Sequence, residues 1–198
     1  MGGFLRLTIC QSIVGYFLAK KQFLFFQSYP NFNLKNKIHQ VGFDSEEVRQ
    51  FFFETAKEIL ASKPADMDIT LHFCQGNLRS KKFYDAKYDG LVDTIFQLPF
   101  SGFFMEFDDE KYCNFALLEK RQGQKIVLGL VNTQSDELED KEVLLKRLEE
   151  ANKHVDPKQI CIATQYVFAS TEASNLISEE GQWRKLDLVH ELVESLNA

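Results

Sequence analysis

The feature that most constrains the fold is a regular alternation of short apolar runs with longer amphipathic segments. The apolar runs predict strands over residues 4–9, 69–74, 102–107, 126–131 and 160–164. Apolar residues at three- and four-residue steps predict helices over residues 45–62, 91–96, 141–153 and 179–196. Asp44 and Ser178 stand where the N-caps of the first and last helices are expected, and the charged run over residues 136–142 is expected to be a solvated helix N-terminus. Strands that alternate with helices are typical of βα units and a parallel sheet.

Composition supports a folded globular chain. The 198 residues include 19 Phe, an excess that needs a core to bury it. A net charge of −6 gives no positive field for phosphate, so we expect no nucleic-acid partner. The apolar run over residues 7–19 is shorter than the roughly 20 residues that span a bilayer, so we expect no membrane segment. Four widely spaced cysteines favour a reducing, cytoplasmic compartment.

Metal-ligating residue types stand at the ends of two successive predicted strands. His72 and Cys74 are two residues apart, so on a strand their side chains point to the same face. Glu106 ends the next strand, and in a parallel sheet we expect its carboxylate near that pair. Together, His, Cys and Glu would leave one open position on a zinc ion, as catalytic zinc sites do. The alternative is a packed thiol beside a hydrogen-bonded imidazole, with Glu106 facing solvent.

Four ordered motifs carry a resemblance to a known family: residues 72–77 (HFCQGN), 102–109 (GFFMEFDD), 127–131 (VLGLV) and 168–171 (FAST), the last followed by Gln182, Trp183, Lys185 and Leu186. The chain resembles cobalamin-independent methionine synthase, and more closely the short bacterial methionine-synthase-like proteins. The resemblance implies an α/β fold, an incomplete TIM-type (β/α)8 barrel with about five parallel strands and flanking helices. It implies that residues 1–198 form a single domain that matches the C-terminal part of the catalytic barrel.

The resemblance also implies a chemistry. In this family zinc binds homocysteine as a thiolate and promotes methyl transfer from a methyl-folate in methionine biosynthesis. Metal coordination makes a thiolate available near neutral pH. By resemblance, His72, Cys74 and Glu106 match the first three zinc ligands, and Asp108 is expected near the substrate.

The chain departs from the family's pattern at the strand-end face. Tyr166 stands where the family has a Cys as the fourth ligand, and a phenol with a pKa of about 10 is a much poorer zinc ligand than a thiolate. Residues 5–10 lack the family's adjacent acids, and Gln75 stands where the short relatives have Arg. Cys10, at the end of the first predicted strand, is an alternative source of the missing thiolate.

Length is the last departure, because eight βα units need about 250 residues. An incomplete barrel has two open strand edges and an exposed inner face, which favour association with other chains. We therefore expect a homodimer or an association with an N-terminal partner fragment. Two functions are compatible with these observations: zinc-dependent methylation of a thiol such as homocysteine, impaired here, or a non-catalytic homologue that acts as a binding or assembly protein.

Overall fold

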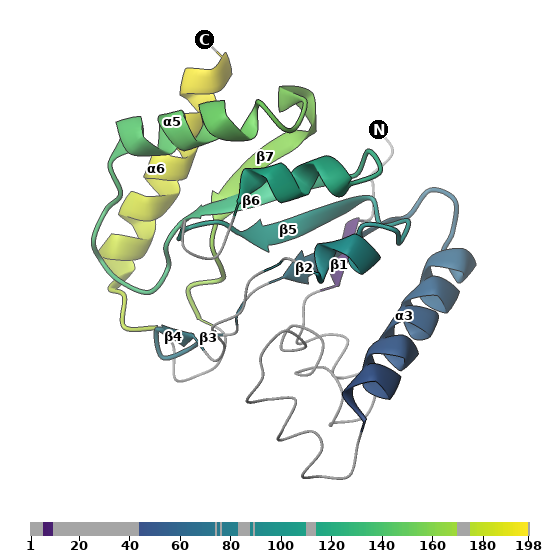
Figure 1. Ribbon diagram of the computed structural model, residues 1–198. Helices are drawn as coiled ribbons and strands as arrows, with labels where there is room; N and C mark the ends of the chain where they lie inside the picture. Colours follow the sequence, from purple (N-terminus) through teal and green to yellow (C-terminus); the bar gives the residue numbers. More distant parts are fainter. Residues whose placement is uncertain are drawn as a thin grey trace. The chain divides into compact units, whose positions relative to one another are not determined.

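The computed structural model of the protein describes residues 6–9, 44–73, 75, 77–82, 88, 90–109, 114–169 and 175–197. Figure 1 labels the helices and strands along this chain. Among the described residues, no helix has both the length and the apolar character needed to cross a membrane. Cys10 and Cys74, two of the residues considered above, lie outside the described residues.

All five predicted strands are confirmed. They are β1 (Arg6–Ile9), β2 (Asp68–Phe73), β5 (Gly102–Glu106), β6 (Lys125–Val131) and β7 (Ile160–Thr164). They form one sheet in the order β1-β2-β5-β6-β7, and both the β1–β2 and the β6–β7 pairs are parallel. This order leaves β1 and β7 as the edges of the described sheet, as expected for an open rather than a closed barrel.

The predicted helices are confirmed as α3 (Ser45–Ser62), α4 (Val92–Ile95), α5 (Lys141–Ala151) and α6 (Glu179–Asn197). There are also two short 3-10 helices: η2 (Phe115–Lys120) lies between β5 and β6, and η3 (Pro157–Gln159) lies between α5 and β7. Asp44 caps α3 by accepting hydrogen bonds from the N–H groups of Glu46 and Glu47. Ser178 caps α6, because its Oγ accepts from the N–H of Gly181 at 3.0 Å. Both predicted caps therefore satisfy helix-terminal donors that would otherwise lack partners.

The chain divides into two compact units that are interleaved along the sequence. Unit 1 comprises residues 1–73, 84–104 and 120–125, and unit 2 comprises residues 74–83, 105–119 and 126–198. Two of the unit boundaries fall inside β5 and β6, and the prediction of a single domain stays a prediction.

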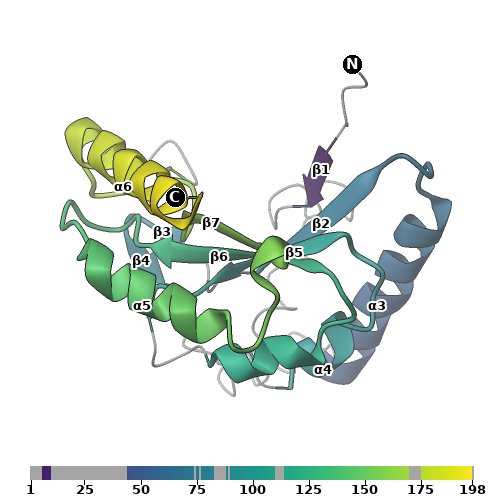
Figure 2. The ribbon, with the colours of Figure 1, turned by 90° about the horizontal axis from the view of Figure 1, so that it is seen from above.

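Phenylalanine contributes to the core of both units, as its abundance predicts. In unit 1 the rings of Phe96 and Phe103 lie 4.9 Å apart and are fully buried. In unit 2 the rings of Phe107 and Phe115 stack at 5.0 Å. Helix α6 packs on β7, next to which it lies in Figure 2, and it also contacts α5. Unit 2 thus has its own core, with a sheet face covered by two helices.

A small antiparallel hairpin was not expected from the sequence. It pairs β3 (Asn77–Leu78) with β4 (Lys81–Lys82), so that Asn77 lies opposite Lys82. Its turn consists of Arg79 and Ser80, which have φ angles of 50° and 62°. Positive φ at both turn residues is typical of a type I′ turn, which matches the twist of the strands it joins.

Candidate functional site

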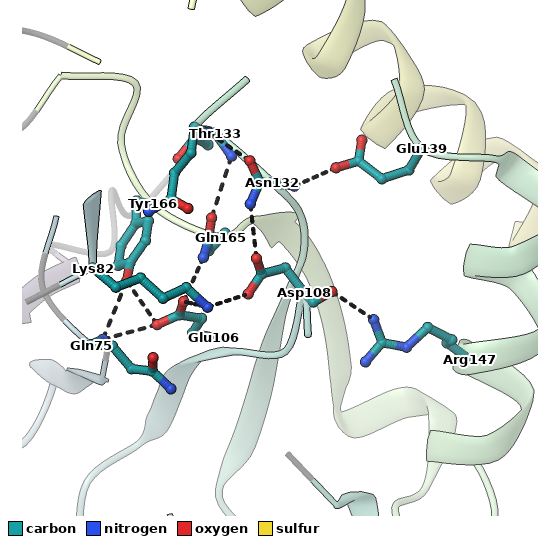
Figure 3. A network of polar contacts seen from close by, with 11 residues as sticks. Gln75, Lys82, Glu106, Asp108, Asn132, Thr133, Glu139, Arg147, Gln165 and Tyr166 are labelled. Carbon is teal, nitrogen blue, oxygen red and sulfur yellow. Dashed lines mark hydrogen bonds and ion pairs between the residues drawn. The ribbon is translucent and has the colours of Figure 1, made fainter. Parts of the chain in front are cut away.

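The candidate site is a polar cluster at the carboxyl ends of β5, β6 and β7, and it lies within unit 2. Glu106 is the last residue of β5, and Asp108 follows it by two. Asn132 and Thr133 follow β6, and Gln165 and Tyr166 follow β7. Because parallel strands end at the same edge of a sheet, their next residues meet there. Figure 3 shows the side chains of Gln165 and Tyr166 directed toward Glu106, and that of Asn132 directed toward Asp108.

Glu106 is the centre of the cluster and is 1% exposed. Its Oε2 accepts hydrogen bonds from the Tyr166 hydroxyl at 2.8 Å and from the backbone N–H of Gln75 at 2.9 Å. Its Oε1 accepts from Gln165 Nε2 at 2.5 Å and pairs with Lys82 Nζ at 3.0 Å. A carboxylate has about four lone-pair positions. All four positions of Glu106 therefore face donors of the protein itself.

Asp108 shares the same lysine. Its Oδ1 lies 3.8 Å from Lys82 Nζ, and its Oδ2 accepts a hydrogen bond from Asn132 Nδ2 at 2.9 Å. Burial and the nearby charge of Glu106 raise the pKa of Asp108 to about 6, although Lys82 and Asn132 act in the opposite direction. Burial disfavours the charged form of Lys82, but the charges of Glu106 and Asp108 outweigh it and raise the pKa of the lysine.

The predicted site residues have different outcomes. Glu106, Asp108 and Tyr166 lie in one cluster, where the tyrosine hydroxyl donates to the glutamate, and their predicted roles stay predictions. His72 lies on β2 in unit 1 and is half-buried. Cys74 is outside the described residues, so the prediction of His72 and Cys74 as ligands stays a prediction. The alternative that Glu106 faces solvent is wrong, because its carboxylate is buried.

The arrangement around Glu106 does not fit a zinc ion. A metal bound to this carboxylate would have to displace one of four donors, and Lys82 already places a positive charge 3.0 Å from Oε1. Tyr166, at the position of the fourth family ligand, uses its hydroxyl to donate to Glu106. Within the described part of the chain, no group of three or more His, Cys, Asp or Glu is placed to hold a metal.

Sequence reasoning missed several members of the cluster. Asn132 and Gln165 follow predicted strands directly, so the strand-end rule could have identified them. Lys82 had no such signal, because it comes from the unexpected hairpin. Its place depends on contacts with residues about 25 positions or more away along the chain.

Comparisons with known proteins show what this chain is similar to. No protein-family model matches the chain. It is 38% identical over 159 residues to the uncharacterized protein YxjG of Bacillus subtilis, a match that covers 79% of this chain and 42% of YxjG. It is 40% identical over 152 residues to YxjH of the same organism, covering 75% of this chain and 40% of YxjH. The chain thus spans about two fifths of the length of the curated relatives it matches.

Two solved structures have a similar fold. One is a Listeria monocytogenes protein described provisionally as a vitamin-B12-independent methionine synthase, with 32% identity and a TM-score of 0.58 over 78% of this chain and 43% of that one. The other is a B12-independent methionine synthase from Shewanella sp. W3-18-1, with 18% identity and a TM-score of 0.61 over 77% of this chain and 44% of that one. The second likeness concerns the fold alone. Both support an incomplete α/β barrel.

Proposed function

We propose that this chain, a methionine-synthase-like relative of the vitamin-B12-independent methionine synthases that matches a C-terminal part of their barrel, is impaired in zinc-activated thiolate methylation. The observation that carries the proposal is the saturation of Glu106 by four protein donors. Thiol methylation needs a thiolate, and zinc lowers the pKa of a bound thiol. A glutamate bound to Tyr166 and Lys82 has no free lone pair to offer such an ion.

The proposed role is that of a non-catalytic homologue that binds or assembles with another chain. The edge strands β1 and β7 support it, since the described sheet shows no pairing of one with the other. Unpaired strand edges present N–H and C=O groups that another chain can use. The proposed partner is a second copy or an N-terminal partner fragment.

The competing candidate is an active zinc enzyme that methylates homocysteine with a methyl-folate. One observation favours it: Glu106 and Tyr166 meet at the strand ends, where the family's ligands are expected. In that case zinc, bound with His72 and Cys74, would have to displace Lys82 or Tyr166 from Glu106.

Zinc content separates the two candidates. The full chain is purified without chelator, and bound zinc and homocysteine methylation are measured in the wild type, Tyr166→Cys and the matched control Tyr166→Phe. We expect far less than one zinc per chain and no methylation in the wild type and in Tyr166→Phe. Tyr166→Cys restores the family's ligand type and is expected to raise zinc binding. One zinc per wild-type chain, lost in Glu106→Gln and accompanied by methylation, would overturn the proposal.

A further inference from the structure

Lys82 occupies an unusual position for a lysine. Its side chain is 20% exposed. Its ammonium lies between the carboxylates of Glu106 and Asp108, whose side chains are only 2% and 7% exposed. Figure 3 shows the side chain extending across the cluster, with its Nζ between the two acids. Lys82 is thus half-buried, and its charge is paired with both acids. The ion pairs of Lys82 with Glu106 and Asp108 are therefore part of the structure of the site.

The hairpin that carries Lys82 is fastened by long-range hydrogen bonds. Asn77, opposite Lys82 in the hairpin, donates from Nδ2 to Asn175 Oδ1 at 2.8 Å. Ser80, in the turn, accepts at Oγ from the N–H of Leu176 at 2.8 Å. Asn175 in turn donates to the carbonyl of Thr133, directly after β6, at 2.9 Å. The segment before α6 thus connects the hairpin to the strand ends and sets where Lys82 lies.

Two carboxylates that face one point are the beginning of a cation site. Glu106 Oε1 and Asp108 Oδ1 are the oxygens nearest Lys82 Nζ, at 3.0 and 3.8 Å. Asp108 Oδ1 is buried and has no hydrogen-bond donor, so the ion pair with Lys82 is its polar contact. Magnesium, calcium and manganese prefer carboxylate oxygens, and an unpaired buried carboxylate pair attracts such ions.

We propose that Lys82 is the built-in cation of this site: its ammonium supplies, between Glu106 and Asp108, the positive charge that a divalent metal would otherwise supply, and thereby excludes metal from the pair. The inference rests on the proposed function and deepens it, because it names the residue that keeps the glutamate away from zinc. Lys82 acts through the two carboxylates and is a positioning residue.

The test is a gain of metal binding on removal of the charge. Binding of Mn²⁺ and of Zn²⁺ is measured by equilibrium dialysis in the full-length wild type, Lys82→Met and the charge-preserving control Lys82→Arg. We expect Lys82→Met to bind one divalent ion about 100-fold more tightly than the other two, since a like charge about 4 Å from the ion is removed. The melting temperature should rise with metal in Lys82→Met alone.

A double variant assigns the ion to this pair. Lys82→Met with Asp108→Asn is expected to lose the gained affinity, whereas a loss of packing alone would not create metal binding in the first place. If Lys82→Met does not fold, Lys82→Gln removes the charge with a polar side chain and takes its place. Equal metal affinity of the folded Lys82 variants and the wild type would overturn the inference. Stoichiometric zinc in the wild type would instead overturn the proposed function, so the two failures are distinguishable.

Discussion

The two units of the chain bury polar groups in very different ways. Of the buried polar or charged side chains among the described residues, only Gln124 lies in unit 1, while Gln75, Asn77, Glu106, Thr133, Arg147, Gln165, Asn175 and Lys185 lie in unit 2. Gln124 is neutral, and its Nε2 donates to the carbonyls of Phe96 and Leu98 at 3.1 and 3.2 Å. Its Oε1 accepts from the N–H of Gln122. In the described part of unit 1, the one buried polar side chain is therefore an amide whose hydrogen bonds are made to the backbone.

Unit 2 instead buries charges. Besides Glu106, it holds Lys185, which is fully buried and donates to both carboxylate oxygens of Glu139 at 3.0 and 3.1 Å. Glu139 also accepts from the N–H of Asn132, whose side chain binds Asp108. Buried ion pairs add little stability compared with apolar residues of the same volume. In the described part of the chain, the buried charges thus gather in unit 2, around the candidate site.

The largest effect that would sharpen this contrast is expected from Lys185→Met. Removing one partner of a buried ion pair leaves the other charge uncompensated, and we expect the free energy of unfolding to fall by about 3 kcal/mol. Urea denaturation followed by circular dichroism measures the change. The double variant Lys185→Met/Glu139→Gln should recover part of the loss, because no unpaired charge remains.

The matched change in unit 1 is Gln124→Leu. It removes the donor to two buried carbonyls but leaves no charge, so we expect a smaller loss of about 1 to 2 kcal/mol. A loss as large as that of Lys185→Met would contradict the distinction between the two units.

The sequence predicts the framework well because local patterns determine it. All five strands and the bounds of α3 follow from apolar periodicity and caps such as Asp44. Glu106 and Tyr166 could be predicted as neighbours because both follow from the resemblance and the strand ends. The charged run 136–142 caps α5 at Asp140, as expected, but Glu139 within it is half-buried against Lys185.

The position of Lys82 could not be predicted, for a physical reason. Strands of two residues carry no periodic signal, and Arg79-Ser80 lacks the Asn-Gly type of sequence that marks a type I′ turn. Asn77 and Ser80 of the hairpin form hydrogen bonds to a segment nearly 100 residues away along the chain. Such a contact is not visible in any local pattern.

A second prediction concerns the pH dependence of stability. The pKa of Asp108 is raised in the folded protein from 3.8 to about 6. The folded state therefore holds this proton more tightly than the unfolded state, and its contribution to stability is full below about pH 4 and is lost as the pH rises through 6. Asp108→Asn should remove this loss. Between pH 4 and pH 7, the free energy of unfolding of the variant should therefore rise by on the order of 1 to 2 kcal/mol relative to that of the wild type.

The measurement is a series of urea denaturation curves from pH 4 to pH 7 for both proteins. A difference in unfolding free energy that does not change over this range would show that the buried carboxylate does not titrate there. Ala61→Ser, at an exposed position in unit 1 that carries no titratable group, is the control and should give curves parallel to those of the wild type.

The smallest effect is expected from the turn of the hairpin, where the two units differ once more. In unit 1 the described residues with positive φ are glycines, Gly90 and Gly123, whereas in unit 2 they are Arg79 and Ser80. A side chain in the left-handed region costs roughly 1 kcal/mol, and Asn tolerates it better than Arg. Arg79→Asn should therefore stabilise the protein by about 0.5 kcal/mol. Lys153→Asn, at an exposed position without positive φ, should not raise the free energy of unfolding.

The same variant tests what holds Lys82 in place. Because the hydrogen bonds of Asn77 and Ser80 remain in Arg79→Asn, Lys82 should keep its position and the variant should still exclude divalent metal. Stabilisation together with new metal binding would instead mean that strain in the turn, rather than the fastening by Asn175, holds the ammonium between the two carboxylates.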